Sequence, residues 1–137
     1  MDKNKTRLFK AEVSTHEDDR RSILDLALPP EIYFPIKQAK TIKYFKKGAI
    51  VGNHYHPIDS QRTEVYIAVG PPQTDLFKFL YREDGNIKEA ILRRGDGCFI
   101  PPGVTHTFET LSDEAAFFGF SNLSVYNPED EVKDILI

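Results

Sequence analysis

The stretch GNHYHPIDSQRTEVYIAVG, residues 52–70, decides how this sequence is interpreted. It holds two of the chain's four histidines, His54 and His56, with a single residue between them. On a β-strand, side chains at positions i and i+2 share a face about 6.6–6.8 Å apart at Cα, so two imidazoles can reach one metal ion. A carboxylate, Glu64, then begins an apolar run. The stretch predicts two strands with a polar site on one face.

A third candidate site histidine, His106, lies in GDGCFIPPGVTHTFET, residues 95–110. Pro101-Pro102-Gly103 favours a tight turn, so we expect His106 to begin a strand and to share a face with Phe108. The chain's only cysteine, Cys98, lies in the same stretch and is expected to be a small buried hydrophobe rather than a nucleophile.

The remaining sequence has an all-β pattern. The length of 137 residues fits a single domain over 1–137, and ten Phe and six Tyr enrich it in strand-favouring rings. Short apolar segments alternate with Pro, Gly and Asp, and Asp84-Gly85 is a strong hairpin signal. The expected strands are Ile23–Leu28, Ile32–Ile36, Thr41–Phe45, Ile50–His56, Glu64–Val69, Asp75–Tyr81, Ile87–Arg93, Gly97–Ile100, Thr105–Thr110 and Ala115–Ser121.

The two ends of the chain differ from this pattern. Residues 1–21 are polar, include the isolated His16, and are expected to form a loose arm or an edge strand. Near the C-terminus, Asn127 followed by Pro128 and two acidic residues predicts one short helix. Many short antiparallel strands need two packed sheets or a closed barrel, and a jelly-roll β-barrel fits their number.

These motifs together resemble those of the cupins. The residues that match the first cupin motif are Gly48, His54, His56, Glu64 and Gly70, and those that match the second are Gly95, Pro101, Gly103, His106 and Thr110. The resemblance implies a cupin-type barrel with a divalent metal ion, which could be Zn, Mn, Fe or Ni. The ligands that it implies are His54, His56, Glu64 and His106.

The first motif departs from the family pattern in its spacing. Seven residues separate His56 from Glu64, which is longer than usual, so Gln61 and Asp59 are alternative fourth ligands. We favour Glu64 because the extra residues are of turn type and insertions are best tolerated in loops. Thr110 replaces an Asn that is often present but is not a usual ligand.

A weaker resemblance points to small cupins that isomerise or epimerise nucleotide-linked keto-sugars. It implies proton abstraction next to a carbonyl, with His54, His56 and Tyr66 as candidate catalytic residues and a sugar or sugar nucleotide as substrate. Those enzymes typically carry an arginine where this chain has Val51. The alternatives are an Fe(II)-dependent dioxygenase of a small organic acid and a non-catalytic module that binds a small ligand.

The composition argues against two classes of binding partner, nucleic acids and membranes. The net charge of −3 with interspersed signs does not favour nucleic acid, and no apolar run reaches the ~20 residues that cross a bilayer. We therefore expect a cytoplasmic protein that contacts neither nucleic acid nor membrane. The resemblance to small cupins implies a homodimer.

Overall fold

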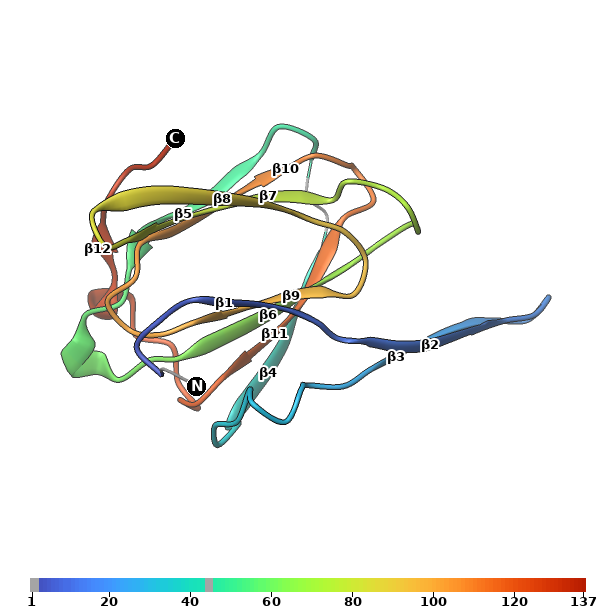
Figure 1. Ribbon diagram of the computed structural model, residues 1–137, viewed down its shortest axis with the longest axis horizontal. Coiled ribbons are helices and arrows are strands. Elements are labelled where there is room, and N and C mark those ends of the chain that lie inside the picture. The colour runs from blue at the N-terminus through green and yellow to red at the C-terminus, as the bar shows by residue number, and fades with distance from the viewer. Residues whose placement is uncertain (1–2, 44–45) are drawn as a thin grey trace.

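Alternating apolar and polar residues fold the middle of the chain into two antiparallel sheets that lie face to face (Figure 1). The computed structural model describes residues 3–43 and 46–137. One sheet contains, in spatial order, β1 (Arg7–Lys10), β9 (Asp96–Ile100), β6 (Glu64–Val69), β11 (Ala116–Ser121) and β4 (Gln38–Ile42). The other contains β12 (Val132–Lys133), β5 (Ile50–Tyr55), β10 (His106–Thr110), β7 (Phe77–Glu83) and β8 (Asn86–Leu92).

These ladders confirm the all-β prediction in part. Every expected strand except Ile32–Ile36 has a counterpart in the structure, with bounds within a few residues of those predicted. β7 and β8 form the hairpin around Asp84-Gly85. The closed jelly-roll barrel is not confirmed, because no strand pairing within the described residues joins the two five-stranded sheets. The observed architecture is a two-layer antiparallel sandwich.

The core lies between the two layers. Phe77 and Phe79 on β7 meet Phe117 on β11, and the Phe77 and Phe117 rings stack with centroids 3.8 Å apart. Cys98 belongs to the same buried cluster, and its burial raises the pKa of its thiol. Cys98 is thus a buried free cysteine, as expected.

A second apolar cluster covers the outer face of the sheet that contains β6. Val65 and Ile67 on β6 pack with Ile32 and Phe99, and Phe34 packs against the same cluster. The strand predicted over Ile32–Ile36 is therefore wrong, because this segment is an irregular cover for the sheet. Pro35 interrupts it, and proline has no N–H to donate to a ladder. The strand predicted over Thr41–Phe45 begins earlier, as β4, and its last two residues lie outside the described residues.

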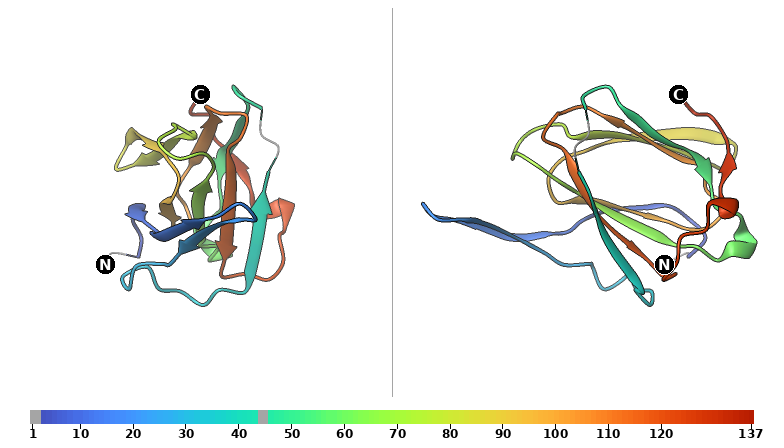
Figure 2. Two further views of the ribbon diagram at one scale, coloured as in Figure 1. Left: turned by 90° about the vertical axis from the view of Figure 1, so that its right-hand side faces the viewer. Right: turned by 180° about the vertical axis from the view of Figure 1, so that it is seen from behind.

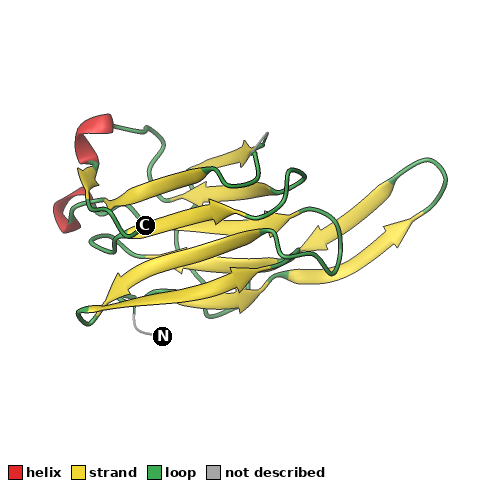
Figure 3. Ribbon diagram, turned by 90° about the horizontal axis from the view of Figure 1, so that it is seen from above, coloured by secondary structure: helices red, strands yellow, loops and turns green. Residues whose placement is uncertain are grey.

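The N-terminal region forms an edge strand and a projecting hairpin. β1 pairs with β9 at the edge of the sheet. β2 (Glu12–Glu17) pairs with β3 (Ser22–Leu26) in a separate two-stranded sheet that extends away from the body (Figures 1 and 3). His16 is exposed on this hairpin.

The opposite end of the molecule carries two short 3₁₀ turns (Figures 2 and 3), η1 (Ile58–Ser60) and η2 (Pro128–Asp130). The predicted C-terminal helix is wrong. Asn127 does cap the turn, because its side chain accepts from the backbone N–H of Glu129 at 3.1 Å. The chain then becomes extended and pairs with β5 as β12, and this tertiary pairing outweighs a helical preference that is weak in so short a segment. No helix in the described part of the chain has the length and apolar character to cross a bilayer.

Candidate functional site

A bulge in β5 aims His54 into the space between the sheets. His106 of β10 lies opposite His54, but the next residue, Thr107, lies opposite Gly52, so Asn53 is the extra residue. The Thr107 hydroxyl donates to the Asn53 side chain at 2.7 Å and fixes the bulge. Gly52 is required there, because a Cβ on it would lie 2.6 Å from the His106 carbonyl oxygen. Bulges commonly redirect a side chain next to a functional site.

The Pro101-Pro102-Gly103 turn brings the two motifs together. The backbone N–H of Gly103 donates to the His56 carbonyl oxygen at 2.6 Å. Gly103 has a φ of +85°, a conformation that glycine adopts without strain. The turn thus fixes the segment that carries His56 and lets β10 begin at His106, as the sequence predicts.

The three histidines converge. One ring nitrogen from each of His54, His56 and His106 lies within 4.8 Å of the others. Glu64 enters from the facing sheet, with its Oε1 atom 3.0 Å from Nε2 of His56 and 3.7 Å from Nε2 of His106. Three separate stretches of chain thus bring these four groups to one point, where Glu64, His56 and His106 are buried and His54 is partly exposed.

The long spacer of the first motif is taken up by the turn η1. Gln61 ends this turn in a left-handed conformation with φ +57° and is exposed, as is Asp59. Glu64 is the acidic residue that begins β6 and faces the imidazoles. The geometry therefore brings Glu64 to the histidines and leaves Gln61 and Asp59 at the surface.

The donor set fits a divalent cation. Nδ1 of His56 faces the Asp130 carbonyl oxygen and Nδ1 of His106 faces the Val104 carbonyl oxygen, each at 3.0 Å. A proton on each Nδ1 leaves an Nε2 lone pair directed at the Glu64 carboxylate. Glu64 Oε1 has no hydrogen-bond donor among the described residues. Acceptors that face one another in this way need a shared proton or a cation between them, and imidazole with carboxylate suits Zn, Mn, Fe and Ni.

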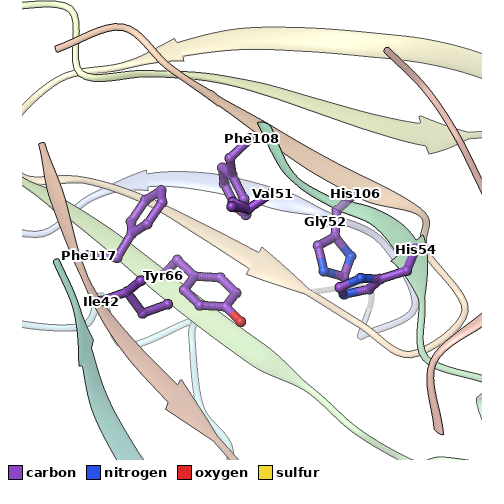
Figure 4. Close-up of a pocket in the computed structure, with 8 residues that line it drawn as sticks. All are labelled: Ile42, Val51, Gly52, His54, Tyr66, His106, Phe108 and Phe117. Carbon is purple, nitrogen blue, oxygen red and sulfur yellow. The ribbon is translucent and has the colours of Figure 1, made fainter. Parts of the chain in front are cut away.

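A cavity of about 160 Å³ opens from this cluster between the sheets (Figure 4). His54 and His106 lie at one end of it, and Tyr66 lies between them and an apolar end, with its hydroxyl directed toward the histidines. The residues that line the cavity are Ile42, Val51, Gly52, His54, Tyr66, His106, Phe108 and Phe117. The hydroxyl donates to Glu64 Oε2 at 2.5 Å, so Tyr66 connects the cavity to the buried carboxylate.

Burial controls the protonation of this cluster. Desolvation lowers the pKa of His106 to about 4 and also lowers the pKa of His54. Burial, together with the neighbouring negative charge of Glu64, raises the pKa of Tyr66 well above its usual value. His106 is therefore neutral near pH 7, and Tyr66 retains its proton.

Two residues of the site belong to neither sequence motif. One of them is Arg62, which lies in the spacer between His56 and Glu64. It is 2% exposed, its Nε lies 3.6 Å from Glu64 Oε2, and its guanidinium lies 5.4 Å from the centre of the Tyr126 ring. Glu131 was not singled out at all, yet its Oε1 lies 3.8 Å from Nε2 of His54. Only the acidic sequence around it could have drawn attention to Glu131.

In comparisons with known proteins, the chain matches solved structures only. No protein-family model matches the chain, and no curated protein does either. A histidine-to-asparagine mutant of the 3,4-ketoisomerase QdtA from Thermoanaerobacterium thermosaccharolyticum, in complex with TDP-4-keto-6-deoxyglucose, matches with a TM-score of 0.71 and 17% identity over 94% of this chain and 87% of that one. A 3,4-ketoisomerase from Helicobacter canadensis matches with a TM-score of 0.70 and 22% identity over 94% and 90% of the two chains.

A third match has a different activity in its description. ChmJ, a 3'-monoepimerase from Streptomyces bikiniensis in complex with dTDP-quinovose, aligns with a TM-score of 0.71 and 17% identity over 93% of this chain and 68% of that one. At these identities the likeness shows the shared fold. The chain has the cupin-like fold that its two histidine motifs predict.

Proposed function

We propose that this protein isomerises or epimerises a nucleotide-linked keto-sugar by moving a proton next to a carbonyl. The observation that carries the proposal is the cavity in which two imidazoles and the Tyr66 hydroxyl converge at one end of an otherwise apolar space. Structures of similar fold are described as 3,4-ketoisomerases of TDP-sugars and as a 3'-monoepimerase, and this supports the same class of chemistry.

His54 is the proposed base. It lines the cavity, and its side chain is 21% exposed, so it is more accessible than His56, whose side chain is 4% exposed and faces Glu64. A neutral imidazole can remove the proton on the carbon beside the sugar carbonyl, and the C–H electron pair then forms an enolate with the carbonyl oxygen. For isomerisation, a proton passes from the hydroxyl on the deprotonated carbon to the former carbonyl oxygen, and the proton held by His54 is returned to the former carbonyl carbon, so that carbonyl and hydroxyl exchange places. For epimerisation, a proton is returned to the original carbon on its opposite face, which inverts the centre.

Tyr66 is assigned the role of hydrogen-bond donor. Its raised pKa keeps the proton on the hydroxyl, and its position between the apolar end and the histidines directs that proton at the polar end of the cavity. A donor placed where negative charge develops on an enolate oxygen stabilises the transition state more than the ground state. In the structure this proton is donated to Glu64 Oε2, so the hydroxyl turns from Glu64 to the enolate oxygen when the substrate binds.

The size of the cavity limits what it holds. Ligand pockets commonly measure roughly 300–1,000 Å³, and this one measures about 160 Å³. It therefore takes the reacting sugar ring, and the nucleotide lies outside. Val51, at the position where the resembling enzymes carry arginine, is part of the cavity wall. The diphosphate must therefore be held by other groups.

We propose, as the alternative to a free His54 base, that the cluster binds a divalent metal ion. His54, His56, His106 and Glu64 would hold it, because their nitrogen and oxygen atoms already face one another. A bound ion supplies Lewis-acid polarisation of a carbonyl oxygen. Elemental analysis of protein purified without a metal-affinity tag tests this. A full equivalent of metal on all three imidazoles would occupy the lone pair of His54 and would contradict His54 as the base.

The test of the proposed reaction is proton exchange. Protein and TDP-4-keto-6-deoxyglucose are incubated in D₂O, and mass spectrometry follows deuterium at the carbon beside the carbonyl while NMR follows the position of the carbonyl. We expect deuterium uptake faster than in the protein-free control, with unchanged rates in the surface variant His16→Asn. No exchange with this or other TDP-keto-sugars would overturn the proposal.

One feature favours the dioxygenase as a second candidate. The imidazoles and Glu64 combine nitrogen and carboxylate ligands beside an apolar cavity, and such sets hold Fe(II) in oxygenases. Stoichiometric iron together with oxygen consumption on a small organic acid would support it. Saturable stabilisation by a sugar nucleotide without any exchange would instead support the binding module.

We further propose a homodimer. The β2–β3 hairpin projects from the body, and an isolated two-stranded hairpin is only marginally stable in water, so a second chain that covers it would stabilise it. Sedimentation equilibrium measures the mass directly. A monomer at all accessible concentrations would contradict the proposal.

A further inference from the structure

The C-terminal segment reaches the histidine pair from outside the two sheets. We name residues 126–134 the C-terminal strap. The Asp130 carbonyl oxygen lies 3.0 Å from Nδ1 of His56, and the Glu131 carboxylate lies 3.8 Å from Nε2 of His54. One short segment thus approaches both His54 of β5 and His56, which follows the end of that strand.

The backbone on both sides of Glu131 is held in place. Its own N–H donates to the Pro128 carbonyl oxygen at 3.3 Å, and the next two residues pair with β5 opposite Tyr55 and His54. Beyond them, the N–H of Asp134 donates to the Asn53 carbonyl oxygen at 2.9 Å, at the bulge that aims His54. The Glu131 side chain therefore starts from a backbone position that is fixed relative to His54.

The carboxylate itself is also held. The Tyr126 hydroxyl donates to Glu131 Oε1, and the Tyr126 ring lies under the Arg62 guanidinium. Arg62 in turn lies beside Glu64. A continuous series of contacts therefore links the two carboxylates near the histidines. It runs from Glu64 through the Arg62 guanidinium and the Tyr126 ring to Glu131.

His54 lies between two spaces. It lines the inner cavity with Tyr66 and His106, and it also lines an outer cleft of about 530 Å³ to which Glu131 and Lys133 contribute. The Glu131 side chain is 30% exposed on that outer side. The Glu131 carboxylate lies beside Nε2 of His54 without lining the inner cavity, so its charge favours one orientation of the imidazole dipole.

We propose that Glu131 is a positioning residue of the site, whose carboxylate beside Nε2 orients the His54 imidazole. The inference rests on the proposed function for its kinetic consequence, but the contact with His54 can be tested without any substrate. Glu131 differs from Glu64 in its position: Glu64 is buried between the sheets, whereas Glu131 approaches His54 from the outer cleft and belongs to the C-terminal strap.

The key variant is Glu131→Gln, which keeps the shape of the side chain and its ability to accept from Tyr126 but removes the charge. In the proton-exchange assay we expect kcat to fall roughly 10–100-fold with KM unchanged, the size of effect typical of groups that orient a functional histidine. Glu131→Asp, which restores the charge, should recover part of the loss. The matched control is Glu129→Gln, which removes an exposed carboxylate from the same turn and should leave kcat unchanged.

The second readout is the ¹⁵N NMR spectrum of the histidine rings, in which His54→Asn assigns the His54 signals. Glu131→Gln should shift the ring signals of His54 and leave those of His16 in place, while Glu129→Gln should shift neither. If Glu131→Gln unfolds the protein, Tyr126→Phe, which frees the carboxylate without removing it, should give a smaller shift of the same signals.

The outcomes separate the two proposals. A wild-type protein without proton exchange, whose His54 signals nevertheless respond to Glu131→Gln, retains the contact and loses the proposed function. Unmoved His54 signals and a wild-type kcat in Glu131→Gln would overturn the role of Glu131 and leave the proposed function intact.

Discussion

The space between the two sheets has two ends that are built from the same strands and differ in chemistry. β6 carries Glu64 at one end and Ala68 at the other, and β10 carries His106 and then Phe108 two residues further on. Side chains two residues apart share a face of a strand, so the inward-facing residues of each strand change from polar to apolar along its length. The polar end contains the imidazole cluster, and the apolar end contains the stacked phenylalanine rings.

The comparison shows how stability and function are divided. The apolar end buries large side chains that gain free energy on leaving water. The polar end buries a carboxylate and histidines at a desolvation cost that their mutual interactions only offset. We infer that the apolar end supplies stability and that the polar end is retained for function. Four predictions test this division.

The largest effect is expected at the polar end. His54→Asn should slow the exchange of the substrate proton by ~10²–10⁴-fold, the usual contribution of a general base. The free energy of unfolding should change little, because the side chain is partly exposed and lies outside the apolar cluster. Exchange kinetics and urea unfolding of the same sample measure both quantities. A variant that loses stability in proportion to activity would contradict the division.

The second prediction concerns the apolar end. Phe117→Ala should lower the free energy of unfolding by about 3–5 kcal/mol, because it removes a stacked ring and leaves a larger cavity. The neighbouring Phe118 points to the other face and is 39% exposed, so Phe118→Ala is a matched control with an expected loss of about 1 kcal/mol or less. Equal losses in the two variants would show that β11 is not seated on the core in this way.

The two ends also differ in how far the sequence predicts them. The spacing of His54, His56 and His106 follows two motifs, and the strand pattern around them is local, so their convergence could be expected. Glu64 could be favoured over Gln61 because turn residues occupy the spacer and an apolar strand begins at Glu64. The metal-ligand and catalytic roles of these residues, the single domain and the cytoplasmic location stay predictions.

Other features depend on pairing between distant segments. Glu131 reaches His54 because β12 adds to β5, and the sequence around it predicted a helix instead. Arg62 is buried because Tyr126 and Glu64 surround its guanidinium, although an arginine next to a loop is usually exposed. The segment from Ile32 to Ile36 has the composition of a strand, but Pro35 and its position over a finished sheet leave it irregular.

The third prediction uses the pH dependence of stability in the presence of a chelator. His106 takes up a proton near pH 6.5 in the unfolded chain but only near pH 4 in the folded one, because burial lowers its pKa. The unfolded state therefore binds more protons between these values, and the free energy of unfolding should fall as the pH is lowered from 6.5 to 4. His54, whose pKa is lowered in the same direction, adds to the slope.

Replacement of the buried histidine should reduce this slope. In His106→Asn the fall in unfolding free energy over the same pH range should be shallower than in the wild type, as measured by urea unfolding at successive pH values. The exposed histidine on the hairpin provides the control, and His16→Asn should keep the wild-type slope. Parallel curves for the wild type and His106→Asn would mean that the polar end is hydrated rather than buried.

The smallest effect is expected just outside the polar end and sharpens its boundary. Gln61→Ala should leave both metal content and proton exchange unchanged, because the side chain is exposed at the end of η1. Glu64→Gln, only three positions away, should lower metal content or exchange roughly 10–100-fold, because it alters the carboxylate that faces two imidazoles. Elemental analysis after equilibration with each metal, together with the exchange assay, compares the pair. If Gln61→Ala has the larger effect, the loop carries the ligand, and the polar end must be redrawn around η1 rather than around β6.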